Sequence, residues 1–245
     1  MLGMKNKVLL LMVLFATVFA AKSQEIQDFK VKVGDFTQLT VVDNINVVYE
    51  CNPDLTGYAK FTAATAMANQ MIFTNNKKGK LSISVGSDSV YNENLPTITV
   101  YSAFLQSAEN LGDSTLHVKS VAPAPKVKFK LVDNGSIKID KVEATTLAVE
   151  ILTGKGEILV NGKCTDLNIK NTGKGTVKAE GVVADNVNCR IVGTGKVYCQ
   201  VNGGALTLKG TGTGKLYYKG KPSSVKQLQL GTLKAISLDE ASESK

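Results

Sequence analysis

Four Gly-x-Gly turns recur in this chain at almost constant spacing. They are formed by Gly154/Gly156, Gly173/Gly175, Gly193/Gly195 and Gly212/Gly214. Successive turns lie 19, 20 and 19 residues apart, and the segments between them alternate apolar and polar residues. Such alternation is the pattern of a β-strand with one buried face. A repeat of about 20 residues built from such strands predicts a solenoid in which each repeat forms one coil.

Each predicted coil contains one strand before the glycine turn and one strand after it. The apolar residues of the first strands are typified by Leu147, Val149 and Ile151. The pattern continues in weaker form upstream to about residue 105 and downstream through Leu228 and Leu230. We therefore predict an all-β fold whose residues 105–238 form a right-handed parallel β-helix of short strands.

The glycines at these turns have an architectural explanation. Neighbouring coils of a solenoid lie only about 4.8 Å apart, so each turn is crowded by its copies above and below. Glycine allows positive φ and close backbone approach where a Cβ would clash. No turn completes Gly-x-Gly-x-x-Gly before a helix, and no Gly-x-x-x-x-Gly-Lys-Ser/Thr occurs, so phosphate-cradling loops are not indicated.

The remaining regions differ from the repeat. Residues 24–104 alternate as β-strands do but at irregular spacing, and we predict a β-rich N-terminal part, either a separate subdomain or a looser start to the solenoid. Residues 239–245 are polar and predict a frayed tail.

The first 23 residues have the features of a signal peptide. Lys5 and Lys7 precede a short apolar run over residues 8–19, and small residues follow at positions 20, 21 and 23. The run is shorter than the roughly 20 residues that a spanning helix needs. We expect residues 1–23 to be removed and the protein to be periplasmic, displayed at the cell surface or secreted, with no membrane span remaining. An uncleaved membrane anchor is the alternative.

The formal net charge of +8 constrains the partners of an exported protein. Outside the cytoplasm, nucleic acid is a poor candidate, whereas anionic glycans and envelope polymers are better ones. Arg190 is the single arginine, and bidentate phosphate clamps usually depend on arginine. A merely solvated basic surface is the alternative explanation of the charge.

Four cysteines in an exported protein suggest disulfides by default. Cys189 and Cys199 lie five residues on either side of the Gly193/Gly195 turn, both at inward positions. Facing sheets are about 10 Å apart, which is too far for a disulfide. We therefore predict buried free thiols at these two positions, and Cys51 and Cys164 have no partner by spacing.

These patterns together resemble a known family. The segment Asp35-Phe-Thr-Gln-Leu-Thr-Val-Val-Asp-Asn-Ile-Asn-Val-Val-Tyr49, the segment Gly79-Lys-Leu-Ser-Ile83 and the Gly-x-Gly coils resemble the "putative auto-transporter adhesin, head GIN domain" family over about residues 35–220. Its members are abundant among exported proteins of Bacteroidetes-type bacteria. The resemblance implies a parallel β-helix-like fold and a surface or periplasmic location, and it carries no catalytic residues.

Candidate binding residues lie in outward columns, where equivalent positions of successive coils stack. The first strands predict one column, which contains Lys130, Glu150, Lys170, Arg190, Lys209 and Gln229. The second strands predict another, which contains His117, Lys138, Leu159, Lys178, Tyr198 and Tyr217, with Lys196 and Lys215 beside the tyrosines.

Six of these residues are the candidate ligand-binding groups. The stripe of Lys170, Arg190 and Lys209 would attract an anionic polymer, and Tyr198 with Tyr217 would offer an aromatic platform for sugar rings, next to Lys178. The alternative is that the charges are merely solvated and the tyrosines stabilise the sheet as a ladder.

An enzymatic function has less support. The outward carboxylates Asp140, Glu150, Glu157 and Glu180 are spread over different columns, although glycoside hydrolysis needs a close carboxylate pair. His117 is the sole histidine, which disfavours histidine triads and zinc sites. We predict a non-enzymatic envelope protein, without cofactor or metal, that binds an anionic glycan or another surface protein. The alternatives are a polysaccharide-active enzyme and a self-associating structural component.

Overall fold

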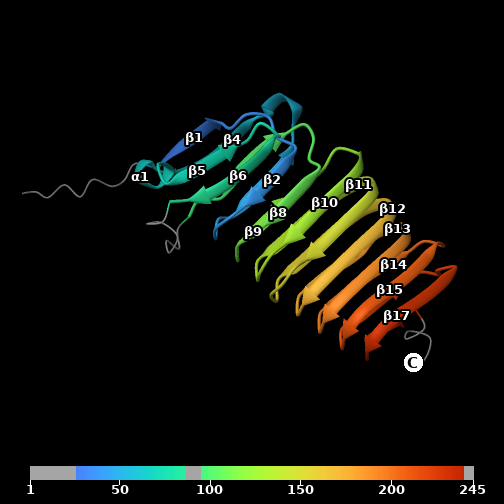
Figure 1. Ribbon diagram of the computed structural model, residues 1–245. Coiled ribbons are helices and arrows are strands. Elements are labelled where there is room, and N and C mark those ends of the chain that lie inside the picture. Colours follow the sequence, from blue (N-terminus) through green and yellow to red (C-terminus); the bar gives the residue numbers. More distant parts are fainter. Residues whose placement is uncertain (1–25, 87–94, 240–245) are drawn as a thin grey trace, which may run out of the picture.

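The computed structural model describes residues 26–86 and 95–239 and consists almost entirely of β-strands stacked into an elongated solenoid (Figure 1). The signal peptide predicted for residues 1–23 and nearly all of the predicted tail lie outside the described residues.

Strands and helices of the first part are short. They are β1 (Ile26–Lys32), β2 (Gln38–Val41), β3 (Val47–Cys51), the 3-10 helix η1 (Pro53–Leu55), β4 (Tyr58–Ala64), α1 (Thr65–Ala68), β5 (Met71–Asn75), β6 (Lys80–Val85) and β7 (Ile98–Ser102).

The second part contains only strands. They are β8 (Ser107–Asn110), β9 (Thr115–Val118), β10 (Ala124–Leu131), β11 (Ser136–Ile151), β12 (Glu157–Gly173), β13 (Thr176–Gly193), β14 (Lys196–Val201), β15 (Ala205–Gly212), β16 (Lys215–Lys219), β17 (Ser224–Gly231) and β18 (Lys234–Ser237).

From β8 onward the chain winds as a parallel β-helix, which confirms the predicted fold class. Each coil has a strand before the turn, here called side A, and a strand after it, called side B. The long strands β11, β12 and β13 each cross side B, bend at a register shift and continue into side A of the next coil. The short segments after these bends (142–145, 162–165 and 182–185) form side C. Seven such coils follow one another, from β8/β9 to β17/β18.

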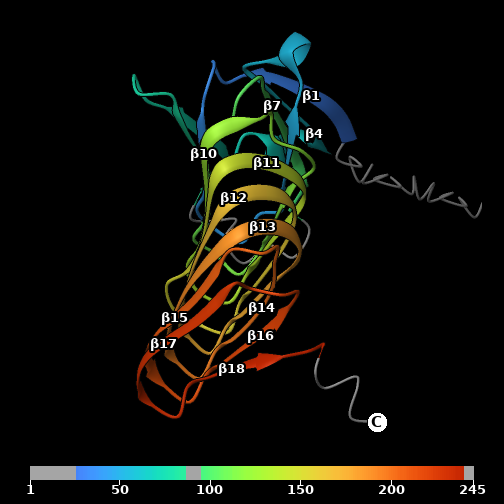
Figure 2. The ribbon, with the colours of Figure 1, turned by 90° about the vertical axis from the view of Figure 1, so that its right-hand side faces the viewer.

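The stack extends further toward the N-terminus than the residue spacing indicates. Strands β2 and β3 pair in parallel with β8 and β9, and β6 and β7 pair in parallel with β2 and β3 on the other side. These two coils therefore follow an order different from that of the chain, which explains why no regular period is visible before residue 105. At the far end, β5 pairs antiparallel with β6, β4 with β7 and β1 with β4 (Figures 1 and 2).

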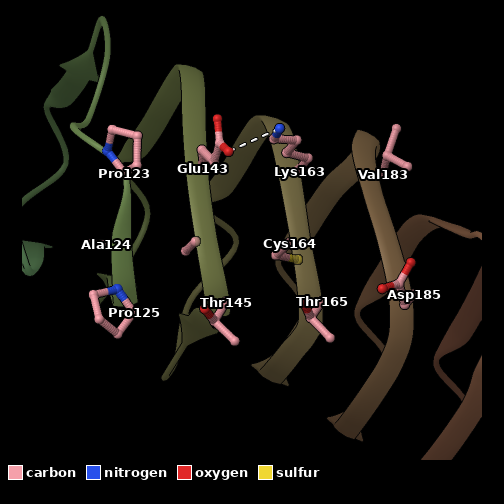
Figure 3. Close-up of a pocket in the computed structure, with 11 residues that line it drawn as sticks. Pro123, Ala124, Pro125, Glu143, Thr145, Lys163, Cys164, Thr165, Val183 and Asp185 are labelled. Carbon is pink, nitrogen blue, oxygen red and sulfur yellow. Dashed lines mark ion pairs between the residues drawn. The ribbon is translucent and has the colours of Figure 1, made fainter.

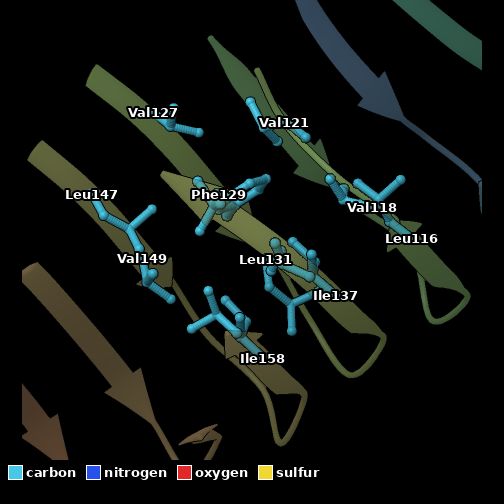
Figure 4. Close-up of a cluster of buried hydrophobic side chains, with 14 of the residues drawn as sticks. Leu116, Val118, Val121, Val127, Phe129, Leu131, Ile137, Leu147, Val149 and Ile158 are labelled. Carbon is cyan, nitrogen blue, oxygen red and sulfur yellow. The ribbon is translucent and has the colours of Figure 1, made fainter. Parts of the chain in front are cut away.

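The core is a set of inward columns of aliphatic side chains. Figure 4 shows neighbouring levels of this core, where Phe129 lies between Leu131 and the valines of the adjacent strands. One side A column runs through Leu81, Leu39, Ala108, Phe129, Val149, Ile169, Cys189 and Leu208, all of them buried. Because the same residue class recurs at each level, every coil buries its apolar face against the next one.

Close approach explains the glycine turns, as the sequence predicts. Gly193 has a φ of +117°, and a Cβ at this residue would lie 2.6 Å from the carbonyl oxygen of Gly173 in the preceding coil. That same carbonyl accepts a hydrogen bond from the Thr194 backbone N–H at 3.0 Å. The turns therefore stack through backbone hydrogen bonds that a side chain at the glycine position would push apart.

Two buried asparagines brace the turns from inside. Asn171 Nδ2 donates to the carbonyl oxygens of Gly175, at 2.8 Å, and Lys196, at 3.2 Å. Asn110 does the same three levels earlier, donating to Ser114 at 2.8 Å and Ser136 at 3.1 Å. Each amide joins its own turn to a neighbouring coil, so these polar side chains satisfy carbonyl groups that would otherwise be buried without a partner.

All four cysteines are free in the structure. Cys189 and Cys199 are both buried, on sides A and B, as predicted from their inward positions. Burial raises the pKa of the Cys199 thiol to about 12 and that of Cys189 well above its ordinary value. No helix within residues 26–86 or 95–239 has the length and hydropathy that a membrane crossing requires.

Candidate functional site

The outward column of side A has nearly the predicted register. Strand pairing places the following residues side by side in successive coils: Lys130, Glu150, Lys170, Arg190 and Lys209. The last predicted member is wrong. Lys209 lies opposite Leu228, whereas Gln229 lies opposite Gly210 at an inward position, because the last coil repeats after 19 residues rather than 20.

The upper part of this column is neutralised by ion pairs. Glu150 pairs with Lys128 at 2.9 Å, and Lys130 pairs with Glu109. The predicted role of Glu150, to offset the charges of Lys130 and Lys170 on its own column, is therefore wrong, because its carboxylate reaches a lysine two residues away along β10.

The lower part of the column remains cationic. Lys170, Arg190 and Lys209 are exposed, and none of them forms an ion pair with a described residue. We call these three residues the basic column. Adjacent strands place them about 4.8 Å apart at the backbone, so the three charges face one another across β12, β13 and β15.

A polar row lies beside the basic column. Asn168, Asn188 and Thr207 occupy the outward positions two residues earlier on the same strands and pair in register. Together with the basic column they line a shallow depression of about 210 Å³. The surface therefore offers three cations and a parallel row of amide and hydroxyl groups to one extended ligand.

The three cations are held together at an electrostatic cost. Two like charges about 5 Å apart in water repel each other by roughly 0.8 kcal/mol, and salt screens part of this energy. A ligand that carries anionic groups at comparable spacing would replace this repulsion with attraction. The basic column is therefore a surface that an anion stabilises.

The outward column of side B also follows the predicted register. It contains His117, Lys138, Leu159, Lys178, Tyr198 and Tyr217 and continues to Ile236. Lys178 forms an ion pair with Glu157 at 2.8 Å, and this hydrogen-bonded partner raises the pKa of Lys178. The charge of Lys178 is thus already compensated within the protein.

The two tyrosines form a stacked ladder. The ring centroids of Tyr198 and Tyr217 are 4.9 Å apart, and the ring planes differ by only 12°. Their facing ring surfaces cover each other, and the column continues with Lys178 on one side and Ile236 on the other. A sugar platform needs an open ring face, so this geometry favours the stabilising role that is usual for cross-strand aromatic pairs.

A second cationic column accompanies the tyrosines. Lys196, Lys215 and Lys234 are exposed and stack in register on β14, β16 and β18. The sequence pattern placed Lys196 and Lys215 beside the tyrosines but missed Lys234, which lies beyond the last Gly-x-Gly turn. These three lysines lie on side B, across the turn from the basic column.

The remaining carboxylates are engaged in ion pairs or separated. Asp140 bonds His117 Nε2 at 2.6 Å and Lys138 Nζ at 3.2 Å. Burial acts to raise the pKa of Asp140, but the hydrogen bonds from these two bases hold it below its ordinary value. Among the described residues no group of three or more His, Cys, Asp or Glu side chains is arranged to hold a metal ion.

A larger cavity, of about 580 Å³, lies on side C (Figure 3). Its rim contains the ion pair between Glu143 and Lys163, at 2.9 Å, and the row of Thr145, Thr165 and Asp185. Burial raises the pKa of the Cys164 thiol in this cavity to about 12, so it is not a reactive nucleophile. The cavity offers volume but no uncompensated cationic cluster.

Solved structures with the same fold come from gut bacteria. A "putative adhesin" from Bacteroides fragilis has 19% sequence identity and a TM-score of 0.79, covering 88% of this chain and 98% of that one. A "putative adhesin" from Parabacteroides merdae has 17% identity and a TM-score of 0.71, covering 88% and 97%. A "putative lipid binding protein" from Parabacteroides distasonis has 17% identity and a TM-score of 0.69, covering 88% and 98%.

At these identities the similarity establishes a shared fold. No match was found among curated protein sequences. The family described as "Putative auto-transporter adhesin, head GIN domain" matches residues 35–222, which include the glycine turns, the basic column and the tyrosine ladder. The chain belongs to this adhesin-like family.

Proposed function

We propose that this protein is a non-enzymatic binding module of the cell envelope that holds an anionic glycan along the basic column. The observation that carries the proposal is the stacking of Lys170, Arg190 and Lys209 in register without any carboxylate partner among the described residues. Export through the signal peptide expected at residues 1–23 would bring this surface into contact with envelope and extracellular polymers.

The shape of the site fits a polymer better than a small molecule. The depression is shallow, and its cations repeat at the spacing of the coils instead of converging on one point. Asn168, Asn188 and Thr207 lie along the same direction and can bond to the hydroxyl groups of a sugar chain. A linear polyanion would thus meet one cation and one neutral polar group per coil.

The alternative of a polysaccharide-active enzyme has less support from the geometry. Its candidate carboxylates Glu150 and Glu157 lie on different sides of a turn, and each forms an ion pair with a lysine. Asp140 is likewise bonded to His117 and Lys138. A general acid and its partner need to converge on one bond, which these groups do not do.

The test is binding to polygalacturonate, with neutral dextran as the reference polymer. We expect the wild-type protein to bind polygalacturonate and the triple charge reversal Lys170→Glu/Arg190→Glu/Lys209→Glu to lose about 10- to 100-fold in affinity, at about 0.5–1 kcal/mol per exposed ion pair. Binding should weaken as salt is added, because screening acts on exposed charges.

A matched control has the same change of net charge on side B. The variant Lys196→Glu/Lys215→Glu/Lys234→Glu alters three lysines that are stacked in the same manner. If both triple variants lose affinity equally, the interaction follows net charge and the assignment to side A is wrong. Failure of the wild-type protein to bind polygalacturonate, chondroitin sulfate or another acidic glycan would overturn the proposed function itself.

A further inference from the structure

The two ends of the solenoid are built differently. At the N-terminal end, antiparallel strands cover the first coil, and the outermost of them, β1, carries Asp28, Lys30 and Lys32. At the other end, β17 pairs only with β15 and β18 only with β16 within the described part of the chain. The last coil therefore presents open strand edges, as the lower end of the ribbon shows (Figure 1).

The open strand β17 lacks the usual protection of an edge. Its eight residues contain no proline and one charge, Lys226. Leu228 and Leu230 are 63% and 76% exposed, which places them among the most exposed large apolar residues of the described chain. Natural proteins normally protect such edges with charges, prolines, bulges or covering elements, because unpaired strands associate.

We propose that β17 is a dimerisation edge, at which two copies of this chain join end to end through antiparallel pairing of their β17 strands. The interior of the last coil is already closed by Leu233, which is fully buried. What remains unsatisfied is the strand edge itself, and a second copy supplies an identical edge with the same hydrogen-bonding groups.

The sequence of β17 selects one register for this pairing. Antiparallel pairing keeps outward residues opposite outward residues, so the two-fold axis passes through a residue position. An axis at Gln229 places Leu228 opposite the partner's Leu230 on both sides of the axis. An axis at Leu228 would instead place Leu230 opposite Lys226, so the apolar match favours the axis at Gln229.

The chain's own C-terminal residues are a poorer occupant of this edge. Residues 240–245 read Glu-Ala-Ser-Glu-Ser-Lys and contain no large apolar side chain. They offer Leu228 and Leu230 no apolar partner, whereas a second β17 offers two leucines. The observations therefore favour a second copy of the chain.

The pairing would have a consequence for side A. A two-fold axis perpendicular to the sheet keeps the outward face outward, so side A of both copies would form one continuous surface. The two basic columns would then lie on the same face, and a long polyanion could contact both, which increases avidity without any new contact. The dimer itself does not depend on the proposed ligand.

The first experiment measures the mass of the protein lacking residues 1–23 by light scattering and sedimentation over a range of concentrations. We expect a concentration-dependent dimer and, for Leu228→Lys/Leu230→Lys, a dissociation constant at least about tenfold higher. The control is Phe104→Lys, which changes an equally exposed apolar residue, 62% exposed, away from this edge. A wild-type protein that remains monomeric at all concentrations overturns the proposal.

The second experiment tests the register by oxidation. Gln229→Cys places two thiols opposite each other at the axis, where antiparallel Cα atoms are about 4.5–5.5 Å apart, within the range of a disulfide. Lys226→Cys is the control, because its twin would be six residues away, about 20 Å along the strand. Equal cross-linking of both variants, or of neither, contradicts this register, and protection of the β17 amides by residues 240–245 in a monomer would assign the edge to the chain's own tail.

Discussion

The glycine ladder makes a graded prediction about stability. In Gly193→Ala the new Cβ would lie 2.6 Å from the Gly173 carbonyl oxygen, and the residue must also keep a φ of +117°. The backbone strain costs about 1–3 kcal/mol and the overpacking a further 1–3 kcal/mol, so we expect a loss of about 3 kcal/mol or more. In a chain of this size each kcal/mol lowers the melting temperature by about 2–4 °C, which gives a decrease of roughly 6–12 °C.

The measurement is thermal unfolding followed by far-ultraviolet circular dichroism, since the chain has no tryptophan to report on packing. Gly203→Ala is the matched control, because Gly203 also has positive φ, +85°, but no heavy atom lies within 4 Å of the position that the new Cβ would take. It should lose only the backbone strain, about 1–2 kcal/mol. Gly173→Ala, with a contact of 3.1 Å, should fall between the two. Equal losses for all three variants would refute the stacking explanation.

Three further predictions follow from the site and the core. Asp140→Asn should flatten the acid limb of stability, because a pKa held below its ordinary value gives stability that is present at neutral pH and lost as the pH falls through the folded-state pKa; denaturation against pH measures this. The thiols of Cys189 and Cys199 should not react with Ellman's reagent until the protein is unfolded, because burial keeps them protonated. Tyr198→Ala and Tyr217→Ala should show a coupling of about 0.5–1.5 kcal/mol in a double-mutant cycle and leave binding of polygalacturonate unchanged.

The columns of the candidate site were predictable because the repeat is regular. Strands that alternate with a period of two and repeat after about 20 residues have one possible parallel register, so the alignment of Lys170 with Arg190 and Lys209 follows from the spacing alone. The misplacement of Gln229 arose where the repeat shortens to 19 residues, and a shift of one residue moves a side chain to the other face. Lys234 was missed because no Gly-x-Gly turn marks its coil.

Partners within the site were not predictable from spacing. Glu150 bonds to Lys128, although Lys130 and Lys170 are its neighbours in the column. Long side chains reach diagonally across a sheet, and register alone does not say which of several lysines a carboxylate will meet. The charge that remains on the basic column is therefore a result of three-dimensional side-chain packing.

The amino-acid sequence by itself determined the fold class, the seven consecutive coils, the glycine turns and the outward columns, because local alternation and stacking sterics depend only on neighbouring repeats. The tertiary structure alone decided the placement of β2, β3, β6 and β7, which join the stack out of chain order. It also decided which end is covered and which is open. Long-range pairing makes these choices, and no residue spacing along the chain records them.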